Sequence, residues 1–159
     1  MIDADSHGVR AIEMTDHRHG DSKILADLLA QLPEGKRIAV IGGDGAYDTR
    51  AVYEASVSRK AALFVPPRRN GKPWKARTAG AGERNETLRA IRYLGQRLWK
   101  RWSGYHRHSL AETAMSRLTR LGKRLAACDP ARQVAEMRLR CAILNPFNRL
   151  RMPDTAAIA

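Results

Sequence analysis

Two short apolar stretches, separated by a glycine-rich turn and a helical segment, constrain the fold of this chain most. RIAVI, residues 37–41, has the character of a buried strand and runs directly into GGDGAYDT, residues 42–49. Thr49 is expected to cap a helix that ends near residue 59, and AALFVPP, residues 61–67, is a second apolar strand closed by prolines. This order of strand, helix and strand predicts an α/β fold with at least partly parallel strands.

The residues before this region predict a hairpin and a helix. MIDADSHGVRAIEMT, residues 1–15, has turn residues near its middle and then alternates apolar with polar residues, which indicates a hairpin. Asp21 and Ser22 are expected to cap the helix that follows. Its apolar face is predicted to consist of Ile24, Leu25, Leu28, Leu29 and Leu32.

The C-terminal half of the chain has helical periodicity. One helix is expected over residues 85–101, with a break at Gly104, and a second over residues 109–121. A third is expected over residues 130–144, with a proline suited to its first turn. The tail, residues 151–159, has no periodicity and is expected to be frayed.

The charge of the chain predicts a polyanionic partner. Its 159 residues include 29 Lys and Arg against 16 Asp and Glu, a formal net charge of +13. Such an excess favours nucleic acid first and an anionic membrane surface second. No apolar run approaches the roughly 18 residues of a spanning helix, and no secretory signal opens the sequence. We therefore expect no membrane partner and a cytoplasmic location.

A basic segment, PPRRNGKPWKARTAGAGER over residues 66–84, is the candidate contact for nucleic acid. It is expected to be a loop, because prolines and glycines recur along it. An aromatic residue among cations suits phosphates and an unstacked base. The candidate binding residues are Arg68, Arg69, Lys72, Trp74 and Lys75. A solvated linker without a binding role is the open alternative.

The segment around Glu112 predicts a helix with two different faces. One face, within an arc of about 80°, consists of Leu110, Ala114, Leu118, Leu121 and Leu125. The opposite face presents Tyr105, His108, Glu112 and Thr119, provided that the helix extends back by one turn. Taken alone, Glu112 has a simpler interpretation, since an exposed helical glutamate is usually only solvated.

Two motifs together resemble the DDE transposases of bacterial insertion sequences, in particular the insertion-sequence-five group. GDGAYD, residues 43–48, is similar to the segment that carries the second catalytic aspartate of these enzymes. GYHRHSLAETAMSR, residues 104–117, is similar to the start of their C-terminal signature: Tyr, two residues, Arg, three residues, Glu, six residues, Lys. The resemblance covers essentially residues 1–150.

The match to the C-terminal signature is incomplete. Tyr105 and Glu112 match it, whereas His108 stands where Arg is usual and Thr119 where Lys is usual. All four residues are candidates for the site, and Tyr105, His108 and Thr119 are expected to contact substrate. Asp48, the second aspartate of GDGAYD, is interpreted instead as a cap of the following helix.

The resemblance implies a ribonuclease H-like mixed sheet with flanking helices, followed by a helical C-terminal part, within one domain over residues 1–150. It implies DNA cleavage and strand transfer with Mg²⁺ or Mn²⁺, hard cations that prefer carboxylate oxygens. Asp44 and Glu112 would be two of three metal ligands. The implied partners are insertion-sequence ends and target DNA, with a second copy of the chain or a full-length transposase as protein partner.

The first catalytic aspartate of the family lies on a strand upstream of the segment that corresponds to MIDAD. The resemblance therefore implies an N-terminally incomplete domain and an incomplete site, unless Asp3 or Asp5 replaces that ligand. The alternative function is a non-catalytic basic fragment that binds DNA or a full-length transposase.

Overall fold

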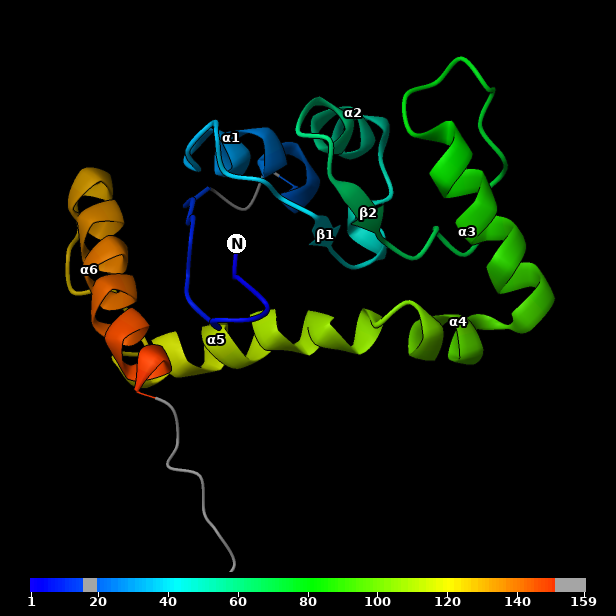
Figure 1. Ribbon diagram of the computed structural model, residues 1–159. Coiled ribbons are helices and arrows are strands. Elements are labelled where there is room, and N and C mark those ends of the chain that lie inside the picture. Colours follow the sequence, from blue (N-terminus) through cyan, green and yellow to red (C-terminus); the bar gives the residue numbers. More distant parts are fainter. Residues whose placement is uncertain (16–19, 151–159) are drawn as a thin grey trace, which may run out of the picture. The chain divides into compact units, whose positions relative to one another are not determined.

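The computed structural model describes residues 1–15 and 20–150 (Figure 1). The chain divides into two compact units. The terminal unit consists of Met1–Ile12 and Leu110–Ala159, and the central unit of Glu13–Ser109. None of the helices in the described ranges is long and apolar enough to cross a membrane.

A small parallel sheet lies in the central unit. Strand β1, Val40–Gly42, pairs in parallel with β2, Ala62–Phe64, with Ile41 opposite Leu63 in the middle of the register. Helix α2, Arg50–Ser58, connects the two strands. The predicted α/β fold with parallel strands is confirmed, although each strand is only three residues long.

Two helices accompany this sheet. Thr49 caps α2 as predicted, because its Oγ1 accepts the N–H of Val52 at 3.4 Å. Helix α1, Leu25–Ala30, lies against α2. Its predicted apolar face is confirmed for the four buried residues Leu25, Leu28, Leu29 and Leu32.

The predicted cap of α1 is wrong. A short 3₁₀ helix, η1, covers Asp21–Lys23, so both expected capping residues already belong to another turn. The N-cap of α1 is Ile24, which makes no side-chain capping hydrogen bond.

The helix predicted over residues 85–101 is two helices. Helix α3, Ala81–Leu94, ends at Gly95, whose φ of 80° and ψ of 153° are not helical, and α4, Gln96–Trp102, follows. Because α3 begins at Ala81, the last residues of the expected loop over 66–84 are helical. A 3₁₀ helix, η3, Tyr105–His108, completes the described elements of the central unit.

The terminal unit contains two long helices, α5, Ser109–Arg120, and α6, Pro130–Arg149. Pro130 occupies the first turn of α6, as expected, and Asp129 caps the helix, which continues five residues past the predicted end at 144. The core contains Leu118, Cys141 and Leu144, with Val9, Ile12 and Met137 packed against it. The N-terminal segment therefore packs against residues contributed by both helices.

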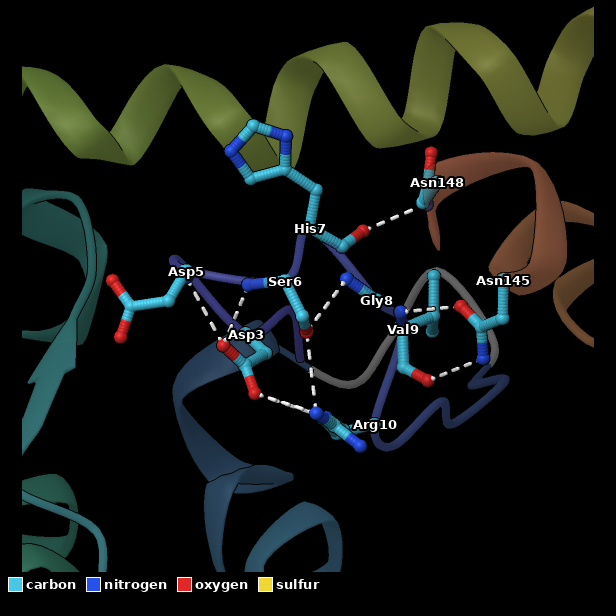
Figure 2. A network of polar contacts seen from close by, with 9 residues as sticks. All are labelled: Asp3, Asp5, Ser6, His7, Gly8, Val9, Arg10, Asn145 and Asn148. Carbon is cyan, nitrogen blue, oxygen red and sulfur yellow. Dashed lines mark hydrogen bonds and ion pairs between the residues drawn. The ribbon is translucent and has the colours of Figure 1, made fainter. Parts of the chain in front are cut away.

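The expected hairpin over residues 1–15 is a tight turn with a single antiparallel bridge, between Ile2 and Val9. The outward N–H and C=O of Val9 bind the side chain of Asn145 on α6 instead of a further strand. Asn148 also donates to the carbonyl of His7, which has a positive φ of 55° (Figure 2). The frayed tail predicted over residues 151–159 lies outside the described residues.

Candidate active site

Asp44 lies in the turn that follows β1. Its Oδ1 accepts the N–H of Ala46 at 2.8 Å, and this bond caps the 3₁₀ helix η2, Gly45–Tyr47. The side chain is exposed. The carboxyl ends of parallel strands are where α/β folds bind their ligands. Asp44 is therefore an exposed carboxylate, held by its own turn, at the edge of the sheet that is suited to a site.

Asp48 is not the helix cap that the sequence suggested. It is buried and forms a bidentate ion pair with Arg84, with Nε–Oδ1 and Nη2–Oδ2 distances of 2.6 and 2.9 Å. Its Oδ2 also accepts the N–H of Arg68 at 2.9 Å. The carboxylate is committed to partners far along the chain, and this leaves the cap of α2 to Thr49.

Arg84 is a buried residue of this region to which the sequence motifs assign no role. The side chain of Arg84 is only 3% exposed. Its burial is indicated by helical spacing, because the buried residues of α3 follow each other at intervals of three and four. They are Ala81, Arg84 and Leu88. A cation on the buried face of a helix requires a partner, since an unpaired buried charge is strongly unfavourable.

The basic loop presents its cations and packs its tryptophan. Arg68, Arg69, Lys72 and Lys75 are exposed. Trp74 is partly buried, with its ring edge-to-face against Tyr53 at 5.1 Å and the guanidinium of Arg84 4.2 Å from its centroid. Burial, together with the negative charge of Asp48, raises the pKa of Tyr53. The ring of Trp74 therefore packs against Tyr53 and Arg84 and remains partly exposed.

The start of the C-terminal signature lies beside β1. Tyr105 belongs to η3, which contacts β1 in the central unit. Its ring centroid is 5.7 Å from that of the buried Trp99, and Lys100 Nζ lies 5.2 Å from the Tyr105 ring. The expected α-helical turn before residue 109 is a 3₁₀ turn instead. The side chain of His108 lies outside the described part of the structure.

Glu112 and Thr119 lie on α5, in the terminal unit, and both are exposed. Ala114 and Leu118 are buried, which confirms the centre of the predicted inward face. Leu121 follows the end of the helix and is exposed, so its place on that face was wrong. The hydroxyl of Thr119 donates to the carbonyl of Ser116 at 2.8 Å within the same helix.

The family model described as the transposase DDE domain matches residues 1–145. The chain belongs to the transposase DDE domain family. No solved structure matches it. Members of this family act on DNA and generally use divalent metals.

Asp3 of the transposase domain is engaged within the N-terminal turn. Its Oδ1 accepts the N–H groups of Asp5 and Ser6 at 3.0 and 3.2 Å, and its Oδ2 accepts from Arg10 at 2.8 Å (Figure 2). Partial burial raises the pKa of Asp3, but these hydrogen bonds outweigh it and lower that pKa to about 2. The carboxylate of Asp5 points away from this network in Figure 2. The contacts of Asp3 therefore serve the turn.

The donor chemistry of the two family motifs fits a hard divalent cation. Asp44 and Glu112 offer carboxylate oxygens, the donors that Mg²⁺ and Mn²⁺ prefer. Asp44 belongs to the central unit and Glu112 to the terminal unit. Over residues 1–15 and 20–150, no three His, Cys, Asp or Glu side chains form a metal-binding group.

Proposed function

We propose that this transposase domain cleaves and joins DNA strands with a divalent metal, Mg²⁺ or Mn²⁺, held by Asp44 and Glu112. The observation that carries the proposal is the exposed carboxylate of Asp44 after β1, with the signature residue Tyr105 on η3 beside the same strand. We further propose a ribonuclease H-like topology and membership of the insertion-sequence-five group, on the two sequence motifs.

Each residue has a role that follows from its chemistry. Bound metal would polarise the phosphodiester and the attacking water or 3′ hydroxyl. The hydrogen bond to Ala46 limits the rotamers of Asp44 and so directs its carboxylate. Glu112 would supply a second carboxylate from the exposed face of α5. We assign substrate contacts to Tyr105, His108 and Thr119.

The proposed site takes a third carboxylate from outside the two motifs. Asp3 is a poor source, because hydrogen bonds of its own turn engage both of its oxygens. With only Asp44 and Glu112 assigned, we expect weak metal binding and slow cleavage until the third ligand is supplied. Domain organisation over residues 1–150 as one catalytic domain is part of the same proposal.

DNA is the proposed partner, through the exposed cations of the basic loop. These are Arg68, Arg69, Lys72 and Lys75. The net charge of +13 supports the assignment. Contacts to phosphate make affinity fall steeply as salt rises and depend little on sequence. A non-catalytic DNA-binding role is the second candidate, favoured by the same four cations on a loop whose backbone is hydrogen-bonded to buried side chains.

A plasmid-nicking assay tests the catalytic proposal. Supercoiled DNA is incubated with the chain and Mg²⁺ or Mn²⁺, and nicked product is quantified with and without chelator. We expect metal-dependent nicking that Asp44→Asn and Glu112→Gln each abolish. Glu83→Gln is the matched control, because Glu83 is also an exposed carboxylate in the first turn of a helix.

The outcomes of this assay separate the two candidates. Nicking that survives both substitutions, or that ignores the chelator, overturns the assignment of Asp44 and Glu112. Salt-sensitive DNA binding without any nicking leaves the binding role and rules out autonomous catalysis by this chain.

A further inference from the structure

The ion pair between Asp48 and Arg84 is buried, with side-chain exposures of 1% and 3%. Removing two charges from water carries a desolvation penalty that their attraction often does no more than balance, so such a pair adds little net stability. A buried pair of this kind is better explained by the groups that it holds in place.

Three residues of the basic loop contact this pair. Asp48 Oδ2 accepts the N–H of Arg68 at 2.9 Å, and Arg84 Nη1 donates to the carbonyl of Lys72 at 2.8 Å. The guanidinium of Arg84 also lies 4.2 Å from the ring centroid of Trp74. The stretch from Arg68 to Trp74 is thereby fixed at both ends to one buried group.

The same pair is joined to Asp44 through a single short turn. Asp44 is the N-cap of η2 and Asp48 is its C-cap, whose N–H donates to the carbonyl of Gly45 at 3.3 Å. One end of this turn is therefore an exposed carboxylate and the other end is the buried anchor. A displacement of Asp48 must alter the turn that orients Asp44.

We propose that Asp48 and Arg84 form a positioning pair, which holds the cations of the basic loop in a fixed place relative to the Asp44 turn. DNA phosphates bound by Arg68 and Lys72 would then be presented to Asp44 in one arrangement. This inference rests on the proposed function, since it assigns DNA phosphate to the loop. Neither member of the pair contacts substrate, because both are buried.

The test replaces the pair as a whole. The double variant Asp48→Leu with Arg84→Met removes both charges, so the net charge of the chain stays at +13. Apolar replacement of a complete buried pair is usually neutral or stabilising, whereas removal of one partner leaves an unpaired charge. A comparator, Arg68→Ala with Lys72→Ala, removes two loop cations directly and leaves the pair intact.

The principal readout is the slope of log affinity for duplex DNA against log salt concentration. A smaller folded fraction weakens binding equally at every salt concentration, whereas lost phosphate contacts reduce the slope by about 0.9 each. We expect the pair variant to reduce the slope by about 1 to 2, as the comparator does. Combining the two double variants should give no further reduction.

Amide hydrogen exchange provides a second readout that does not need DNA. In the pair variant the amides of Arg68 and Ala46 should exchange about tenfold faster or more, because the loop and the Asp44 turn lose their anchor. The amide of Arg132, which donates to Oδ2 of the N-cap residue Asp129 in the terminal unit, should be unchanged.

The outcomes separate the positioning role from the proposed function. A folded pair variant with the wild-type slope and unchanged exchange at Arg68 overturns the positioning role alone. Slope losses that add fully in the combined variant do the same. If the wild-type chain binds DNA without salt dependence, or not at all, the proposed function fails and the positioning role fails with it.

Discussion

Asn145 forms two hydrogen bonds with the backbone of Val9, a residue 136 positions earlier in the chain. Its Oδ1 accepts the N–H of Val9 at 2.7 Å and its Nδ2 donates to the C=O of Val9 at 3.0 Å (Figure 2). The amide thus satisfies both backbone groups as a neighbouring strand would. It joins a segment near the beginning of the family match, which covers residues 1–145, to the last residue of that match.

Removing this amide should destabilise the terminal unit. Asn145→Ala leaves two partly buried backbone groups of Val9 without their partners, and we expect the free energy of unfolding to fall by about 2 kcal/mol. Urea denaturation measures the change. The control is Asn148→Ala, whose bonds are exposed and whose loss should cost less than about 1 kcal/mol. Equal effects of the two substitutions would contradict this account of the contact.

Two glycines at the start of α3 should respond to alanine in opposite ways. Gly80 has a φ of +69°, and a Cβ there would lie 2.4 Å from Tyr53 Cδ1. Gly80→Ala should therefore lower stability by about 3 kcal/mol. Gly82 is helical with nothing within 4 Å of an added Cβ, so Gly82→Ala should be neutral or raise stability by up to about 1 kcal/mol. Thermal melts of both variants, compared with wild type, measure this difference, and a destabilised Gly82→Ala would contradict it.

The N-terminal turn should weaken in acid. The pKa of Asp3 in the folded chain is about 2, below its ordinary value of 3.8, so the ionised form stabilises the turn. This stabilisation is complete above pH 4 or so and is lost as the pH falls through about 2. Asp3→Asn keeps an acceptor oxygen but not the charge.

The measurement is the difference in unfolding free energy between wild type and Asp3→Asn, followed from pH 5 down to pH 2. We expect this difference to shrink as the pH falls. A difference that stays constant over this range would show that the charge of Asp3 contributes nothing to folding.

Two substitutions of Asp44 should separate the structural role of this residue from its proposed catalytic role. Asn can make the same hydrogen bond to the N–H of Ala46, whereas Ala cannot. The free energy of unfolding of Asp44→Asn should therefore lie within about 0.5 kcal/mol of the wild-type value, whereas that of Asp44→Ala should be lower by about 1 kcal/mol. Calorimetry of the two variants measures these differences. An equal loss of stability in both variants would contradict the capping role of the hydrogen bond. Any loss of nicking in Asp44→Asn then reflects the missing charge.

Local patterns predicted the local structure of this chain. The two apolar stretches on either side of Thr49 predicted the parallel strands, and Thr49 itself predicted the cap of α2. Both predictions succeeded because burial patterns and capping depend on only a few neighbouring residues. The same reasoning placed Ala114 and Leu118 in the core. The same reasoning predicted α3 and α4 as a single helix, because the apolar spacing continues past Gly95. The backbone of Gly95 is not helical, and the helix therefore ends there.

Contacts between distant segments could not be predicted in this way. Asp48 has the sequence context of a helix cap, and its true partner lies 36 residues away on α3. The ring of Trp74 packs against Tyr53 and Arg84, contacts that its sequence context of prolines and cations does not indicate. Such pairings depend on how the elements pack, and the sequence marks them only by a charged residue on an otherwise buried helical face.

Locating the bound metal along the chain tests directly whether Asp44 and Glu112 hold it. Fe²⁺ can be substituted for Mg²⁺ in the presence of DNA, and the radicals that it forms with peroxide and ascorbate cut the polypeptide beside the bound ion. We expect cuts near Asp44 and near Glu112, both lost in Asp44→Asn and in Glu112→Gln and both suppressed by excess Mg²⁺. Cleavage elsewhere in the chain, or cleavage at these positions that persists in both variants, would contradict a metal held by these two carboxylates.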